Sequence, residues 1–86
     1  MSDHPTDFVG NVHEAISMSI KEKLPDATVE SSGSGGHYSI AVVSTAFAGK
    51  SLLEQQRTVM SAIKHLLAGA QPPIHAVDSL ITNTPS

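Results

Sequence analysis

The sequence predicts a small α+β domain whose elements follow the order α-β-β-α-β. Two segments repeat apolar residues at helical spacing, and between them lies a run of β-branched residues that alternate as in a strand. The length of 86 residues suits one domain and is too short for two. We therefore expect both helices on one face of a three-stranded sheet, with residues 1–6 as a flexible lead-in and 7–86 as the folded domain.

The first helix is predicted from an amphipathic stripe near the start of the chain. Its apolar residues recur every four positions at Phe8, Val12, Ile16, Ile20 and Leu24. Thr6 or Asp7 can cap the first turn, because either side-chain oxygen can accept a free backbone N–H. Pro25 is expected to end the helix, because the residue before a proline disfavours the helical conformation.

Two strands are predicted next, joined by a glycine-rich loop. Residues 27–31 form the first candidate and residues 37–44 the second, in which Tyr38, Ile40 and Val42 share one face. The segment 32–36 between them contains three glycines, so we expect a β-hairpin with a relatively long loop.

The second helix is expected after a connector over residues 45–50, from which Phe47 is predicted to enter the core. Ser51 and Glu54 have the spacing of a capping box, and apolar residues recur at helical spacing over 52–70. The remaining predicted features are a helix end at Gly69 and Pro72-Pro73, a third strand over residues 74–81 and a polar tail over residues 82–86.

The composition excludes several kinds of protein. No cysteine is present, so the chain alone cannot supply a cysteine nucleophile, a Cys-based zinc site or the thiolates of an iron–sulfur cluster. Five Lys and Arg against eight Asp and Glu give a net charge of −3, unlike a strongly basic nucleic-acid-binding protein. No apolar run is long enough to cross a membrane, and the first residues lack a secretory or transit pattern. We therefore expect no membrane association and a cytoplasmic location.

Two motifs known from enzymes are present only as fragments. Gly49-Lys50-Ser51 resembles the end of a phosphate-binding P-loop, but the first glycine of that motif would fall on Ser44. His13-Glu14 begins like a helical zinc motif, but the second histidine would fall on Ser17. No serine elbow or close pair of acids suggests catalysis either.

Five histidines remain as candidate functional residues. His37 and His75 each open a predicted strand directly after a break in the chain, where a side chain is held firmly and stays reachable. Imidazole is a common metal ligand, but two imidazoles cannot complete a tetrahedral site, so a structural role remains the alternative for both. His4 in the lead-in, and His13 and His65 on solvated helix faces, are expected to have no special role.

The motifs along the chain together resemble those of the BolA family. In order, they are His37-Tyr38-x-Ile40-x-Val42-Val43-Ser44, Phe47-x-Gly49-Lys50-Ser51, Arg57-x-Val59, Ile74-His75-Ala76-Val77 and Thr84-Pro85. Their order and spacing agree with the family from about residue 8 to residue 85. The resemblance implies a fold related to type II KH domains, which agrees with the element order predicted above.

The resemblance also implies an iron–sulfur adaptor that is not an enzyme. BolA proteins pair with monothiol glutaredoxins and share a [2Fe-2S] cluster, to which the partner contributes one cysteine and a bound glutathione. The family's histidine at the start of the last strand matches His75, and a second ligand from between the first two strands is matched best by His37. Two histidines can complete one iron of such a cluster, as in Rieske centres, and the free chain is expected to hold no cofactor. The implied role is cluster transfer or iron and redox regulation.

The same family implies an alternative function, a transcriptional regulator that binds DNA or RNA through the KH-like surface. Lys50 and Arg57 are the candidate contacts, although so few basic residues supply little affinity for phosphates. The sequence departs from the common pattern at Gln55-Gln56-Arg57, where many members have Arg-His-Arg, and it has no cysteine before His37. It also stops at Ser86, so contacts made by the final helix of most members are not expected.

Overall fold

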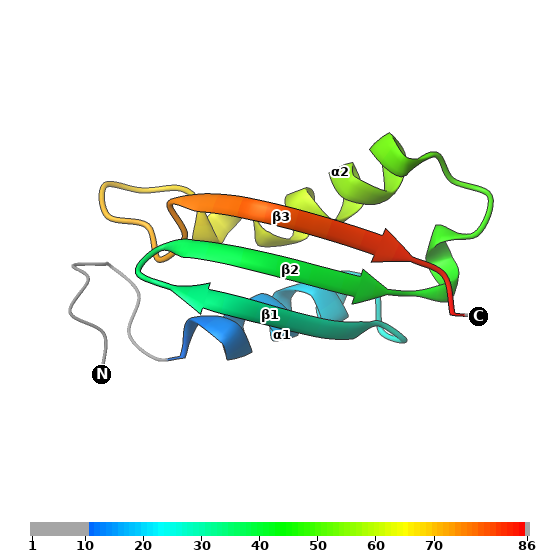
Figure 1. The fold of residues 1–86 in the computed structure, drawn as a ribbon, viewed down its shortest axis with the longest axis horizontal. Helices are drawn as coiled ribbons and strands as arrows, with labels where there is room; N and C mark the ends of the chain where they lie inside the picture. Colours follow the sequence, from blue (N-terminus) through cyan, green and yellow to red (C-terminus); the bar gives the residue numbers. More distant parts are fainter. Residues whose placement is uncertain (1–10, 86) are drawn as a thin grey trace.

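The structure, a computed structural model, describes residues 11–85 and has the predicted order of helices and strands (Figure 1). Its elements are α1 (Val12–Lys23), β1 (Thr28–Ser34), β2 (His37–Val43), the 3-10 helix η1 (Thr45–Phe47), α2 (Leu52–Ile63), the 3-10 helix η2 (Lys64–Leu66) and β3 (Ala76–Asn83). The predicted lead-in over residues 1–6 lies outside the described residues.

Helix α1 begins later than the sequence predicted. Asn11 caps it, because the Asn11 side chain accepts a backbone N–H of the first turn at 3.2 Å. Thr6 and Asp7, the expected caps, lie outside the described residues. The helix ends with Leu24 as its C-cap, directly before Pro25, as predicted.

Strands β1 and β2 form the predicted hairpin, but the loop between them is shorter than expected. Strand β1 extends to Ser34, which pairs with His37, so only Gly35 and Gly36 connect the strands. These glycines have φ angles of +64° and +89°, as a type I′ turn requires. The sequence suggested a longer loop because residues 32–36 contain only serine and glycine, which rarely favour strands.

Helix α2 begins as predicted and ends earlier. The capping box is confirmed, since the Glu54 N–H donates to Ser51 Oγ at 3.1 Å and the Ser51 N–H donates to Glu54 Oε1 at 3.0 Å. The α-helix stops at Ile63 and is followed by η2, so the predicted extension to Ala70 was wrong. The N–H of Ile74 donates to the last residue of η2 at 3.1 Å, which turns the chain back toward the sheet.

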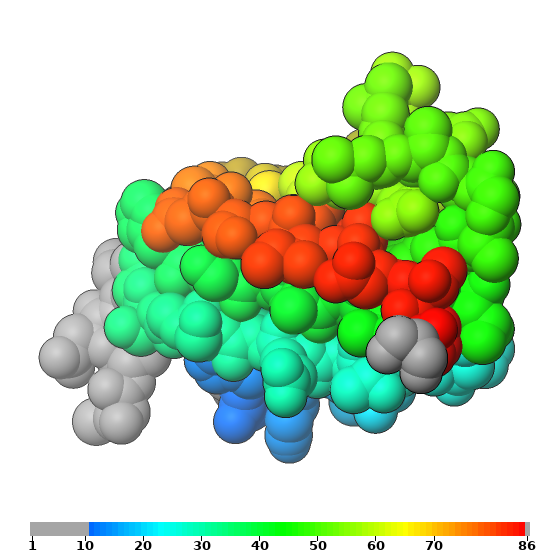
Figure 2. Space-filling model, turned by 45° about the vertical axis from the view of Figure 1, so that its right-hand side comes forward, coloured from blue at the N-terminus to red at the C-terminus, as the bar shows by residue number. Residues whose placement is uncertain are grey.

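Strand β3 lies two residues farther along the chain than the predicted 74–81, and it includes two residues assigned to the polar tail. It pairs in parallel with β2, whereas β1 pairs with β2 in antiparallel fashion, so β2 is the central strand. A parallel pair needs a long crossover, which α2 provides here. Figure 2 shows β3, coloured orange to red, running along the surface beside β2.

Both helices cover one face of the sheet, as predicted (Figure 1). The buried apolar residues between helices and sheet are Ile16, Ile20, Leu24, Ala27, Tyr38, Ile40, Val42, Phe47, Val59, Ile63, Leu66 and Ile74. Phe47 is 1% exposed, which confirms that η1 inserts its aromatic ring into the core. Within residues 11–85, no helix is long and apolar enough to cross a membrane.

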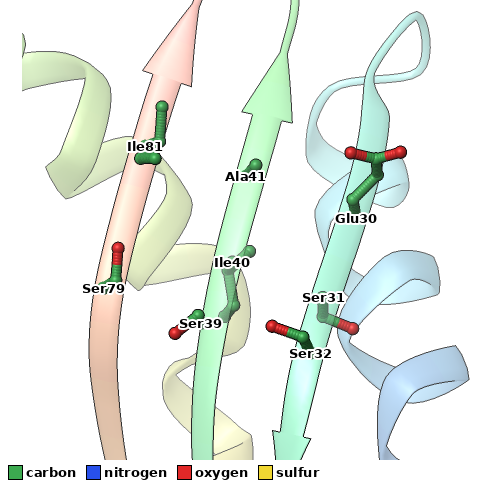
Figure 3. A pocket seen from close by; sticks show the side chains of 8 residues that line it. All are labelled: Glu30, Ser31, Ser32, Ser39, Ile40, Ala41, Ser79 and Ile81. Atoms are coloured by element: carbon green, nitrogen blue, oxygen red, sulfur yellow. The ribbon is translucent and has the colours of Figure 1, made fainter.

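The opposite face of the sheet carries mainly small side chains. Figure 3 shows a shallow hollow there, lined by Ser32, Ser39, Ala41 and Ser79, with Glu30 on β1 and Ile81 on β3. Helices α1 and α2 both lie on the other side of the strands, so neither covers this face. One sheet face thus forms the core, and the other leaves the starts of β2 and β3 accessible.

Candidate metal-ligating site at the start of β2 and β3

The two candidate ligands lie at the same end of the sheet. His37 is the first residue of β2 and pairs with Ala76, the first residue of β3, so His75 directly precedes the neighbouring strand. Neighbouring strands in a sheet are about 4.8 Å apart. Figure 1 shows this end, where the turn between β1 and β2 adjoins the orange start of β3. We call it the histidine end.

A single backbone carbonyl joins the two histidine segments. Gly36 precedes His37, and its oxygen accepts the N–H of His75 at 2.7 Å and the N–H of Ala76 at 3.0 Å. Gly36 is buried, whereas His37 and His75 are exposed. The backbone therefore holds the two residues together while both side chains remain within reach of another molecule.

The His37 ring has a carboxylate partner. Its Nδ1 lies 3.3 Å from Oδ1 of Asp78, and the two side chains are 58% and 56% exposed. An exposed pair of this kind contributes little to stability, about 0 to 1 kcal/mol at most. The pair instead fixes the orientation of the His37 ring, because Nδ1 faces the Asp78 carboxylate.

The imidazoles of His37 and His75 are enough for part of a metal site and too few for a complete one. In the part of the chain that the structure describes, no three or more His, Cys, Asp or Glu side chains are placed to hold a metal ion. Two exposed imidazoles at one end of a sheet can ligate one iron of a [2Fe-2S] cluster when a second molecule supplies the remaining ligands. The described residues therefore offer two exposed imidazoles at this end, and the other ligands of any metal group bound here would come from a second molecule.

His13 is not on a solvated helix face, and that prediction was wrong. The residue is half-buried, its Nδ1 lies 2.6 Å from Ser31 Oγ, and its Nε2 lies 3.2 Å from the carbonyl oxygen of Gly33. Its ring meets that of Tyr38 edge-on, with centroids 5.2 Å apart. Because a carbonyl only accepts hydrogen bonds, Nε2 carries the proton. His13 thus ties α1 to the hairpin, a role that only tertiary packing reveals.

His65 is exposed, as predicted, and belongs to η2 and not to α2. Its Nε2 lies 3.2 Å from Ser19 Oγ of α1, so it bridges the two helical segments. His65 is on the helical side of the sheet and takes no part in the histidine end. His4 lies outside the described residues.

The two candidate nucleic-acid contacts do not form a strongly basic patch. Lys50 precedes α2 and Arg57 lies within it, and both are exposed. Hydrogen bonds from the backbone N–H and the hydroxyl of Ser51 lower the pKa of Glu54, and the charge of Lys50 lowers it further. The Glu54 carboxylate therefore offsets the charge of Lys50, and phosphate binding gains no support from the described residues.

Gln55 and Gln56 in α2 make internal contacts. Gln55 donates through Nε2 to the carbonyl of Lys50 at 3.0 Å, and its Oε1 accepts the hydroxyl of buried Thr82 at 2.7 Å. Gln56 donates to the carbonyl of Leu80 at 3.1 Å. These side chains hold α2 against β3 and add no positive charge.

The opposite end of β2 contains a polar cluster that the sequence did not reveal, which we call the Asp26 clasp (Asp26, Ser44 and Thr45). Asp26 accepts the Thr45 N–H at 2.8 Å, the Thr45 hydroxyl at 2.7 Å and the Ser44 hydroxyl at 2.7 Å. The Thr45 N–H and the two hydroxyls lower the pKa of Asp26 from 3.8 to about 2. Ser44, predicted to be the last residue of the second strand, caps η1 instead.

Comparison with known proteins identifies the family. A family model described as a BolA-like protein matches residues 11–86. Comparison with functionally curated proteins gave no match.

Solved structures of BolA proteins have the same fold. The crystal structure of a bol-like protein from Babesia bovis superimposes with a TM-score of 0.70 at 30% identity, covering 94% of this chain and 91% of that one. The solution structure of BolA1 from Mus musculus gives 0.70 at 29% identity, with coverage of 99% and 74%. The BolA domain of SufE1 from Arabidopsis thaliana gives 0.73 at 23% identity, with coverage of 91% and 96%, and shows the fold alone. Because the family match spans nearly the whole length, this chain belongs to the BolA-like family.

Proposed function

We propose that this chain is a non-enzymatic iron–sulfur adaptor that binds a monothiol glutaredoxin and shares with it a glutathione-ligated [2Fe-2S] cluster. In this role it takes part in cluster transfer or in iron and redox regulation. His75 and His37 are the residues of this chain that would hold the cluster. The partner would supply the thiolates, which a chain without cysteine lacks.

One observation carries the proposal: both imidazoles are exposed at one end of the sheet, with their backbones joined through the Gly36 carbonyl. A glycine at this position is buried and leaves no side chain between the two strands. The backbones that carry the two imidazoles are therefore held together before a partner binds, which limits the conformational entropy lost on association.

The open sheet face beside the histidine end leaves room for the partner. Its central residues are small, and neither helix covers it (Figure 3). A partner that approaches the exposed ends of β2 and β3 would meet the small side chains of Ser39 and Ser79 on this side. A bound cluster would supply redox and iron-transfer chemistry, while this chain would bind the partner and orient the two imidazoles.

The proposal is tested by mixing the chain with a [2Fe-2S]-loaded monothiol glutaredoxin and glutathione. We expect a heterodimer by size-exclusion chromatography with light scattering, and visible absorption and circular dichroism that differ from those of the glutaredoxin alone. His75→Ala and His37→Ala should each change this spectrum. His65→Ala is the matched control, because it removes an exposed histidine on the helical side. Identical spectra for wild type, His75→Ala and His37→Ala would contradict the proposal.

A further inference from the structure

The histidine end contains a carboxylate that the family motif does not explain. Asp78 is the third residue of β3, and its Oδ1 lies 3.3 Å from Nδ1 of His37 on the neighbouring strand. This pair joins β2 and β3 through their side chains at this end.

An irregularity in the sheet places Asp78 there. Tyr38 pairs with Val77, but the next residue of β2, Ser39, pairs with Ser79, so Asp78 is an extra residue in β3. Such a β-bulge changes the direction of a side chain relative to a regular strand. In a strand without the bulge, Asp78 would pair with Ser39, the position that Ser79 has here. With the bulge, the Asp78 side chain contacts His37 instead.

The contact determines which nitrogen of His37 is free. An ionised carboxylate only accepts hydrogen bonds, so Nδ1 carries the proton in this contact. The neutral ring then presents the lone pair of Nε2, the atom that points away from Asp78. Metal-ligating histidines commonly donate their other ring N–H to a carboxylate in this way, which fixes the tautomer and the ring orientation.

We propose that Asp78 is a positioning residue that holds His37 as its Nδ1–H tautomer, so that Nε2 is the ligating atom. This inference rests on the proposed function for the identity of the ligand. Its structural part, the tautomer of His37, holds for the free chain and is measured without any partner.

The first experiment determines the tautomer in the free chain. Long-range ¹H–¹⁵N correlation spectra, recorded near pH 8 where an ordinary imidazole is neutral, distinguish Nδ1–H from Nε2–H. We expect Nδ1–H for His37 in wild type and a shift toward Nε2–H in Asp78→Ala. Asp78→Asn should keep Nδ1–H, because its amide oxygen also accepts. Glu30→Gln, which alters another carboxylate on the open face, should change nothing. An Nε2–H tautomer in the wild type would overturn the inference.

The second experiment links the tautomer to the shared cluster. In the complex with loaded glutaredoxin, Asp78→Ala should shorten the lifetime of the cluster spectrum by about tenfold, the lower end of effects seen for such supporting residues. In a His37→Ala background the same substitution should have no further effect. An equal loss in both backgrounds would show that Asp78 acts independently of His37, and the inference would be wrong.

These two experiments also separate the inference from the proposed function. If histidine substitutions leave the cluster spectrum unchanged, the proposed function fails, while the tautomer of free His37 still decides the role of Asp78. If the histidine substitutions change the spectrum and the tautomer is Nε2–H, the function stands and the positioning role fails.

Discussion

The two ends of β2 are built in opposite ways. At the Asp26 clasp, the Asp26 carboxylate accepts the Ser44 and Thr45 hydroxyls and the Thr45 N–H, and Ser44 is fully buried. At the histidine end, the backbone is joined through Gly36, but the imidazoles of His37 and His75 are exposed. One end has a buried hydroxyl within a network of internal hydrogen bonds, and the other exposes two imidazoles at the surface.

In this small domain, the residues expected to stabilise the fold are therefore separate from those expected to bind a partner. The clasp and Phe47 close the core where α1, η1 and the end of β3 meet, so changes there should unfold the protein. The exposed imidazoles contribute little to folding, so changes there should affect the shared cluster and leave the fold intact. The following predictions test this separation.

The largest effect is expected for Phe47→Ala, beside the clasp. Removal of a fully buried aromatic ring costs about 3 to 5 kcal/mol, a large part of the stability of a small domain. Urea denaturation followed by far-UV circular dichroism measures the loss. Leu52→Ala is the matched control, because Leu52 is 61% exposed and should lose far less. Equal losses would show that Phe47 is not the core residue at this end.

Gly33→Ala should show how far the histidine end depends on its backbone. Gly33 has a φ angle of +111°, and an added Cβ would lie 2.2 Å from the carbonyl oxygen of His37. We expect a loss of about 2 to 4 kcal/mol from strain and steric conflict. Gly35→Ala is the control, since its φ angle of +64° also strains an added side chain, but a Cβ there meets no atom within 4 Å. Thermal unfolding compares the two, and a smaller effect for Gly33→Ala would contradict the hairpin geometry.

Ser44→Ala tests the clasp itself. The substitution removes the donor to Asp26 and the acceptor of the Ala46 N–H, at 2.7 and 3.1 Å. We expect a loss of about 1 to 2 kcal/mol, which lowers the melting temperature by roughly 5 to 15 °C. Ser32→Ala, on the exposed face of the sheet, should change it little. An equally small effect for Ser44→Ala would mean that the clasp does not stabilise the fold.

The acid dependence of stability should come in part from Asp26. Its pKa is lowered from 3.8 to about 2, so its contribution is present above pH 4 and is lost as the pH falls from about 4 to 2. Asp26→Asn should therefore lower stability at neutral pH and make the curve of unfolding free energy flatter between pH 4 and pH 2. Glu30→Gln is the control carboxylate substitution. A wild-type slope retained in Asp26→Asn would rule out this origin.

The smallest effect on folding is expected for His37→Ala. The side chain is 58% exposed and its one ion pair is with an exposed carboxylate, so the free energy of unfolding should change by no more than about 0.5 kcal/mol. The same variant should alter the cluster spectrum of the complex. Chemical denaturation of the free chain measures the first quantity, and a loss of several kcal/mol would show that the two ends of β2 do not divide stability from binding.

Local sequence patterns predicted much of the fold. The Ser51 and Glu54 capping box, the alternation in β2 and the proline after Leu24 depend on neighbouring residues, and each prediction was confirmed. The element ends were less predictable. The glycines after Ser32 predicted a loop over residues 32–36, but the type I′ turn contains only Gly35 and Gly36 between the strands.

The sequence predicted the candidate site only in part. His37 and His75 could be selected because each opens a predicted strand, and the family resemblance assigned them a role. Their shared position at one end of the sheet depends on the parallel pairing of β2 with β3, which local patterns do not specify. The contacts of His13 with the hairpin and of Asp26 with Ser44 were missed for the same reason.

The order of the elements, the buried stripes of the helices and the lack of thiolates all followed from the chain itself, because periodicity and composition are properties of neighbouring residues. The register between β2 and β3, the bulge that directs Asp78 to His37 and the clasp around Asp26 exist only in the folded molecule. Each joins residues that lie far apart in the chain, and packing of the helices on one sheet face is what brings them together.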